Sequence, residues 1–263
     1  MSIELFIFLL TLAWVAGFGA GFIGLGGGVL LFPLLLYLPP YLGLDPIDAK
    51  AAAALVISQV FFAGIIGGTA HWRKGRVHRQ LTMVGALASA AGAFIGGVSS
   101  KWASEWFLLL LFGFITILAG LIMFLPGPPP HKEVAHIDTV RVSTIPLSAV
   151  SCVVGAVVGL LGAGNFLFVP LFIYVLKIPT RITIGSSLVI HVLNSFSGFL
   201  GKLITDQIPF LPTIAVVIGA GFGAFVGEKS HSRSSPQVLR LVYSVVIGTV
   251  AARVWITILF SNG

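Results

Sequence analysis

Charged side chains are scarce in this sequence. Only 9% of its 263 residues are Asp, Glu, Lys or Arg, and just eight are acidic. A soluble globular domain usually carries about 25% charged residues, so this chain lacks the material for a water-facing surface. The hydrophobic fraction is 57%, and the mean hydropathy is +1.07. This composition excludes an ordinary soluble enzyme and a disordered chain. It predicts an all-α protein that crosses a membrane several times.

Cysteine is nearly absent as well. With Cys152 alone, no intrachain disulfide can form, which excludes a disulfide scaffold. The net charge of +7 is of the sign that suits nucleic acid, but most lysines and arginines lie between apolar runs, where they set membrane orientation. We therefore expect the lipid bilayer, and no nucleic acid, as a partner. The start, Met1 to Glu4, lacks the basic residues of a signal peptide, so we take it as part of the mature protein.

Apolar runs dominate the rest of the chain. A spanning helix needs about 20 apolar residues. Two uncharged runs, 5–44 and 142–176, are much longer, and each is interrupted by glycines and then a proline, Pro33 or Pro170. Each of these two is therefore either a bent single span or a hairpin. Six other stretches have a simple spanning length: 49–71, 80–98, 105–125, 182–204, 208–227 and 236–260.

The two long runs also open two similar halves. The segment Gly24–Tyr37 resembles Leu161–Tyr174, so that Gly27 pairs with Gly164 and Gly28 with Asn165. Two further matches follow in the same order, which favours an internal duplication. We predict a first transmembrane repeat over residues 1–125, a polar, proline-rich linker over 126–141 and a second repeat over 142–263. Each repeat would hold one glycine-broken helix or hairpin followed by three spanning helices.

The basic residues favour one topology. If both long runs are hairpins, ten basic loop residues share the side of Arg73–Arg76 and three lie opposite; single spans would divide them seven to six. Because cytoplasmic loops carry the excess of Lys and Arg, hairpins are favoured. Each half then has an odd number of spans beside its hairpin, and the halves are inverted, as in many transporters. Parallel repeats remain the alternative.

Broken helices expose backbone groups that lipid cannot satisfy. Gly26, Gly27 and Gly28 form a nest of N–H groups at the start of a helix, and the second copy has Gly164, Asn165 and Phe166. Such a place favours an anion with several oxygens. The alternative is that the glycines only allow close helix packing. Packing is the favoured interpretation for a second set of glycines, spaced four residues apart: Gly92, Gly96, Gly223 and Gly227.

Polar side chains follow both breaks. Ser58 and Gln59 follow the first, whereas Ser187, His191 and Asn194 follow the second and share one helical face. Lipid would penalise this face, so it is expected to point into the protein. His191 could donate to an anion, relay protons, or be a buried histidine without a role. Arg253, late in the last apolar run, either binds the anion or extends to the interface.

Signals for catalysis are weak. The sequence has no G-x-S-x-G motif, and no acidic residue shares the span of Ser187 and His191. Its histidines are scattered, and there is no Walker motif. We therefore expect a protein that is not an enzyme and that uses no metal and no cofactor.

The glycine motif Gly24–Gly28 with Pro33, its second copy ending at Pro170 and the small-residue spans after each resemble the TauE/SafE family of membrane transporters. This resemblance implies transport of sulfite or an organosulfonate across the bacterial inner membrane. The site residues named above would bind this anion, and the halves would rock for alternating access. A membrane enzyme, an assembly factor without transport and a carrier for another solute stay open as alternatives, as does homo-oligomerisation.

Overall fold

The computed structural model describes residues 1–23, 27–72, 78–124 and 142–231, together with residues 249, 252, 255 and 256. Its long helices are α1 (Ile3–Ile23), α2 (Gly28–Tyr41), α3 (Ala49–Trp72), α4 (Arg79–Ser99), α5 (Glu105–Phe124), α6 (Thr144–Leu161), α8 (Thr180–Leu203) and α9 (Phe210–His231). No strand occurs in these described ranges, which confirms the all-α prediction. The predicted linker at 126–141 lies outside the described residues, so the division into two repeats stays a prediction.

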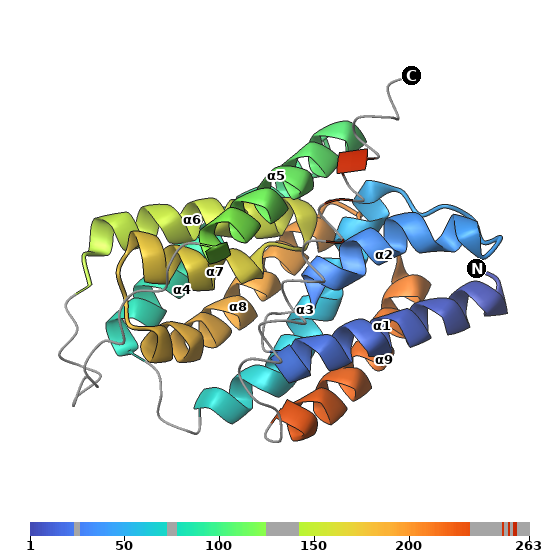
Figure 1. The fold of residues 1–263 in the computed structure, drawn as a ribbon. Coiled ribbons are helices and arrows are strands. Elements are labelled where there is room, and N and C mark those ends of the chain that lie inside the picture. The colour runs from blue at the N-terminus through green and yellow to red at the C-terminus, as the bar shows by residue number, and fades with distance from the viewer. Residues whose placement is uncertain are drawn as a thin grey trace.

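The first long apolar run is a hairpin. Helix α1 ends at Ile23, and α2 begins at Gly28 and runs back beside it (Figure 1). A Cβ atom at Gly19 in α1 would lie 3.0 Å from Leu30 Cδ1 in α2, so the two arms touch. Gly27 joins them with a φ of 61°, a left-handed conformation that glycine adopts without steric cost.

The second long run is broken at the corresponding place. Helix α6 ends at Leu161, and Gly162 and Gly164 have φ values of 70° and 134°. The chain then continues as a 3₁₀ turn (Asn165–Leu167), the short α7 (Phe168–Pro170) and a π-helical turn (Leu171–Val175). Because α8 begins at the end of the molecule where α6 also begins, this segment too has turned back (Figure 1).

Helix length separates full spans from partial ones. Five helices in the described part of the chain are long and apolar enough to cross a membrane: 3–22, 79–99, 105–122, 144–161 and 210–227. The returning segments of the hairpins, α2 and residues 165–175, are shorter. At 1.5 Å per residue α2 reaches about 21 Å, less than the roughly 30 Å of a bilayer core. The segments that return from the breaks are therefore too short to cross the bilayer core.

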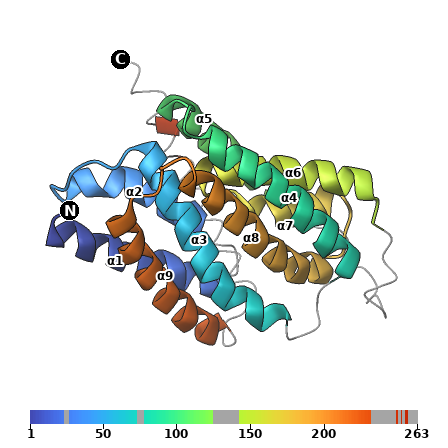
Figure 2. The ribbon, with the colours of Figure 1, turned by 180° about the vertical axis from the view of Figure 1, so that it is seen from behind.

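Two pairs of helices pack along tight seams. Helix α1 packs along α9, and α4 packs along α6 (Figure 2). A Cβ atom at Gly223 would lie 2.1 Å from Trp14 O, and one at Gly92 would lie 2.1 Å from Cys152 O. Equivalent overlaps occur at Gly96 and Gly227, so all four of these glycines serve close packing, as predicted.

Helices α3 and α8 lie side by side between these seams. Gly64 faces Val192, and Ile57 faces Gly198, so the two helices run in opposite directions. Helices α1 and α6, which open the two halves, also run in opposite directions (Figure 1). Corresponding helices of parallel repeats would share one direction. These directions therefore support the inverted-repeat interpretation.

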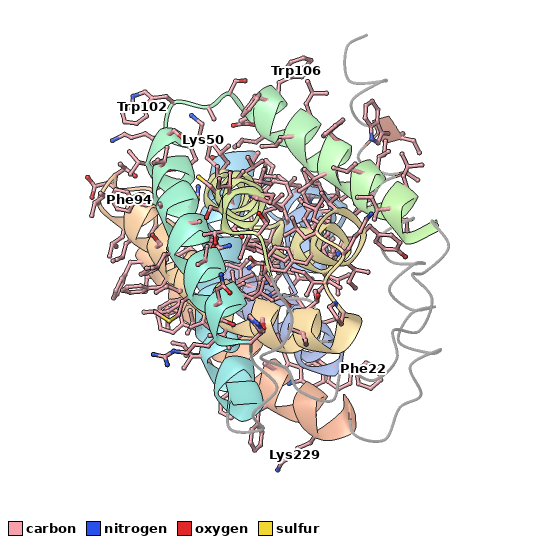
Figure 3. All side chains as sticks on the ribbon, turned by 90° about the vertical axis from the view of Figure 1, so that its left-hand side faces the viewer. Phe22, Lys50, Phe94, Trp102, Trp106 and Lys229 are labelled. Carbon is pink, nitrogen blue, oxygen red and sulfur yellow. The ribbon has the colours of Figure 1, made fainter. Side chains whose placement is uncertain are left out.

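The two ends of the bundle differ in their side chains. Lys50, Trp102 and Trp106 lie at one end, and Phe22 and Lys229 lie at the other (Figure 3). Trp102 is 72% exposed and Trp106 55%, as expected of aromatic residues at a membrane interface. The separation of Lys50 from Lys229 agrees with the charge distribution that favours hairpins.

Candidate functional site

The two helix breaks meet inside the bundle. A Cβ atom at Gly28 would lie 3.3 Å from Gly162 O and 2.9 Å from Val56 Cγ1. One at Gly162 would lie 2.3 Å from Ala53 O. Both breaks therefore contact residues 53–60 of α3, which are buried. The sequence predicts two breaks that share one location, and the structure brings them together.

Gln59 lies directly beside the first break. Its Nε2 atom is 2.7 Å from the position of a Cβ at Gly27. Gln59 is fully buried, and neither Nε2 nor Oε1 has a hydrogen-bond partner among the described residues. A primary amide in this state is unusual because buried polar groups are nearly always satisfied. Gln59 thus offers two donors and an acceptor to whatever reaches the break.

Ser58, the other predicted residue on α3, is used differently. Its hydroxyl donates to Ala54 O at 2.7 Å, a bond within its own helix. The hydroxyl therefore keeps only acceptor lone pairs for a ligand, which suits an anion poorly. Ser58 and Gln59 are neighbours in the sequence, but only the Gln59 side chain has free hydrogen-bond donors among the described residues.

Asn165 organises the second break. It is the first residue of the 3₁₀ turn and is 3% exposed. Its Nδ2 donates to Ser195 Oγ at 3.2 Å, and its Oδ1 accepts from Asn194 Nδ2, also at 3.2 Å. These two bonds fix the break to α8. The Oδ1 atom of Asn194 has no partner in the described chain. Phe166, the next residue along the break, is also buried.

His191 lies one turn before Asn194 on α8. Its ring hydrogen-bonds to the backbone of Asn165 and lies 5.4 Å from the ring of Phe168. Nε2 has no partner among the described residues. Ser187, a further turn earlier, is 1% exposed. The structure therefore brings Asn165 of the second break together with His191 and Asn194, which spacing places on one face of their helix. Their role in binding stays a prediction.

Ser195 is the polar residue that sequence reasoning omitted from the site. Steps of three and four residues select the face of Ser187, His191 and Asn194, and Ser195 falls to one side of it. Asn165 lies between Asn194 and Ser195 and bonds to both. Only the position of the second break makes Ser195 part of the group.

Some predicted residues cannot be compared with the structure. Gly26 and Arg253 lie outside the described residues. Among those described, no three His, Cys, Asp or Glu side chains gather. The polar group beside the breaks consists of amides, hydroxyls and an imidazole. This chemistry suits a small polar solute better than a metal ion.

Comparison with known proteins assigns the family. Residues 9–254 match the model of the family described as "Sulfite exporter TauE/SafE". The chain belongs to the TauE/SafE family. Its match to a "Probable membrane transporter protein" of Xylella fastidiosa strain 9a5c is 31% identical over 255 residues, with 95% of each chain covered. No solved structure shows significant similarity.

More distant TauE/SafE relatives cover as much of the chain. The "Probable membrane transporter protein YunE" of Bacillus subtilis is 24% identical, with 92% of this chain and 94% of its own length covered. The "Probable membrane transporter protein MJ0441" of Methanocaldococcus jannaschii is 23% identical, with 93% and 95% covered. The family and these relatives indicate a multi-pass membrane transporter. The names of the relatives state no substrate.

Proposed function

We propose that this TauE/SafE protein moves a small anion, sulfite or an organosulfonate, across the bacterial inner membrane by alternating access. One observation carries the proposal. Beside the two helix breaks, Gln59, His191 and Asn194 each bury polar atoms that have no partner in the described chain. Leaving such atoms unpaired is costly, so this arrangement supports a polar ligand, or water that a ligand displaces.

The charge of the region favours an anion. Helix α2 starts at the first break and the helical stretch 165–175 starts at the second, so both N-terminal ends, with their partial positive charge, lie at the breaks. Gln59 adds two N–H donors. The described acidic residues of the loops, Asp45, Asp48 and Asp206, lie at helix ends and not at the breaks. A pyramidal oxyanion such as sulfite would meet several donors at once. The description of the family as a sulfite exporter supports sulfite or a related sulfonate.

The architecture supports alternating access. Helices α1 and α6 begin the two halves in opposite directions, and each packs against a helix of the other half. Movement of one half relative to the other would then open the shared location to one side and close it to the other.

Flux measurements in proteoliposomes test this proposal. Wild-type protein should take up ³⁵S-labelled sulfite, and unlabelled sulfite or sulfoacetate should compete better than acetate. Gln59→Leu keeps the side-chain volume and removes the amide, and it should lower uptake at low sulfite about tenfold or more, which corresponds to about 1.4 kcal/mol. Thr213→Val is a matched control, because Thr213 Oγ1 is also buried without a hydrogen-bond partner in the described part of the chain but lies at the start of α9.

The alternatives predict other results. If the protein were a membrane enzyme or an assembly factor, sealed proteoliposomes that contain it would take up none of these anions. A carrier for another solute would show flux that acetate blocks as well as sulfite does. Equal loss of uptake in Gln59→Leu and Thr213→Val would remove Gln59 from the site.

A further inference from the structure

A lysine is buried near the end of α8. The hairpin topology puts Lys202 on the side opposite Arg73–Arg76 as a basic loop residue, but it lies in the last turn of α8 with no exposed surface. It is therefore not a loop residue, because its side chain turns inward between helices. A buried ammonium is costly unless charged or strongly polar partners compensate it.

Both hydrogen bonds of Lys202 go to uncharged oxygens. Nζ donates to Ser100 Oγ at 2.5 Å and to Leu160 O at 3.2 Å. Among the described residues, no carboxylate lies within ion-pair distance of Nζ. The compensation must therefore come from dipoles and not from an opposite charge.

Both oxygens lie at helix C-termini, one at that of α6 and one at that of α4. Leu160 lies in the last turn of α6, immediately before the second break, and Ser100 is the C-cap residue of α4. Lys202 itself lies in the last turn of α8. Helix C-termini carry unpaired carbonyl groups and a partial negative charge. Their meeting at one point makes a place that is built for a cation.

Neighbouring polar groups reinforce this place. Ser100 Oγ is 2.9 Å from Gly97 O and 2.7 Å from Gln207 Oε1, and one of these accepts its proton. Gln207 Nε2 also donates to Gly97 O at 2.9 Å. Lys50, at the same end of the bundle (Figure 3), donates to Lys101 O at 2.9 Å, and its charge repels that of Lys202. Lys202 therefore stays buried in spite of its charged neighbour.

We propose that Lys202 is a tethered cation whose ammonium occupies a site formed by the carbonyl of Leu160 and the hydroxyl of Ser100, next to the second break. In transporters with broken helices, such helix ends can coordinate a free sodium ion or a proton. Here the chain supplies the positive charge itself. The second break consequently needs no alkali cation, and sodium is not the coupling ion at this position.

Chemical rescue tests the proposal. Lys202→Ala deletes three carbons and the ammonium, which together have the length of propylammonium. In detergent with choline chloride, this variant should unfold about 4 °C or more below the wild type. Propylammonium should restore at least half of that loss, and sodium part of it. Tetramethylammonium, which has no N–H group, should restore none. The proposal fails if neither propylammonium nor sodium raises the Tm of Lys202→Ala.

Two further variants act as controls. Lys101→Ala removes an exposed ammonium at the same end and should show no response to amines. In Lys202→Met, the methionine side chain fills the space of the lysine side chain but carries no charge. This variant should therefore be less stable than the wild type, and propylammonium should not raise its Tm. If Lys202→Ala does not fold, Lys202→Met decides the question, since a wild-type Tm in that variant would overturn the proposal.

The coupling ion needs a separate measurement on the wild type. Replacing sodium by choline should change anion uptake in proteoliposomes less than twofold, and a larger dependence would contradict the tethered cation. This readout rests on the proposed function, whereas the thermal shifts do not. Amine rescue in a protein that moves no anion would therefore overturn only the proposed function.

Discussion

The side-chain amide of Gln59 occupies the space that any side chain at residue 27 would need. Its Nε2 lies 2.7 Å from the Cβ position of Gly27, and Ala16 O lies 2.8 Å from that position on the other side. Glycine at this residue therefore does two things. It allows the left-handed turn of the hairpin, and it leaves room at the start of α2 for a buried amide that has no hydrogen-bond partner among the described residues.

Gly27→Ala should abolish anion uptake and destabilise the protein. The φ of 61° alone costs a non-glycine residue about 1–3 kcal/mol, and the new methyl group would overlap both Gln59 and a backbone carbonyl. The control is Gly120→Ala in α5, where an added Cβ would meet no atom of the described residues within 4 Å. Thermal unfolding and uptake should both be near wild type in the control. Equal behaviour of the two variants would contradict the close contact at the break.

Asn165 and Ser195 should act as a pair. Asn165→Ala removes bonds to both Asn194 and Ser195, so it should cost about 1–3 kcal/mol in stability, and Ser195→Ala somewhat less. The double variant should cost less than the two changes added together, by about 0.5 kcal/mol or more. Unfolding of the four proteins in a double-mutant cycle measures this difference. Ser197, which donates to Ala90 O, gives the comparison cycle, and its effect should add to that of Asn165→Ala.

The variant His191→Phe tests whether His191 binds the substrate or only packs in the protein interior. Phenylalanine keeps the ring and its packing beside Phe168, but it loses Nε2 and the bond to the backbone of Asn165. We expect a folded protein whose apparent affinity for sulfite falls about tenfold, because Nε2, which has no partner among the described residues, is available to the substrate. Saturation of uptake with sulfite measures this affinity. An unchanged half-saturation concentration would mean that His191 is a packing residue.

Labelling from outside the cell tests the topology. In a Cys152→Ala background, a cysteine at Trp102 and one at Lys229 should lie on opposite sides of the membrane, because these residues lie at opposite ends of the bundle (Figure 3). A membrane-impermeant maleimide should modify the cysteine at 102 in intact cells, and the one at 229 only after the cells are opened. The excess of basic residues near Lys229 predicts this orientation. Modification of both in intact cells would exclude it.

Much of the fold could be predicted because membrane insertion depends on local composition. The scarcity of charge, the length of the apolar runs and the glycine and proline interruptions specify helices and breaks without reference to any distant residue. The positions of α3, α4, α5, α8 and α9 follow the predicted spans within a few residues. The glycines of the α1–α9 and α4–α6 seams could also be assigned to packing from their spacing of four.

The site required the tertiary structure. The sequence by itself determined a helical membrane protein with two interrupted runs and marked Gly27, Asn165 and His191 as residues of interest. Tertiary packing decided that the Gln59 amide has no partner among the described residues, that Ser58 is bonded within its own helix, that Ser195 belongs with Asn165, and that Lys202 is buried. Periodicity specifies which face of a helix a residue occupies. Which partner that face meets depends on helices that are distant along the chain, and their contacts leave no local signal in the sequence.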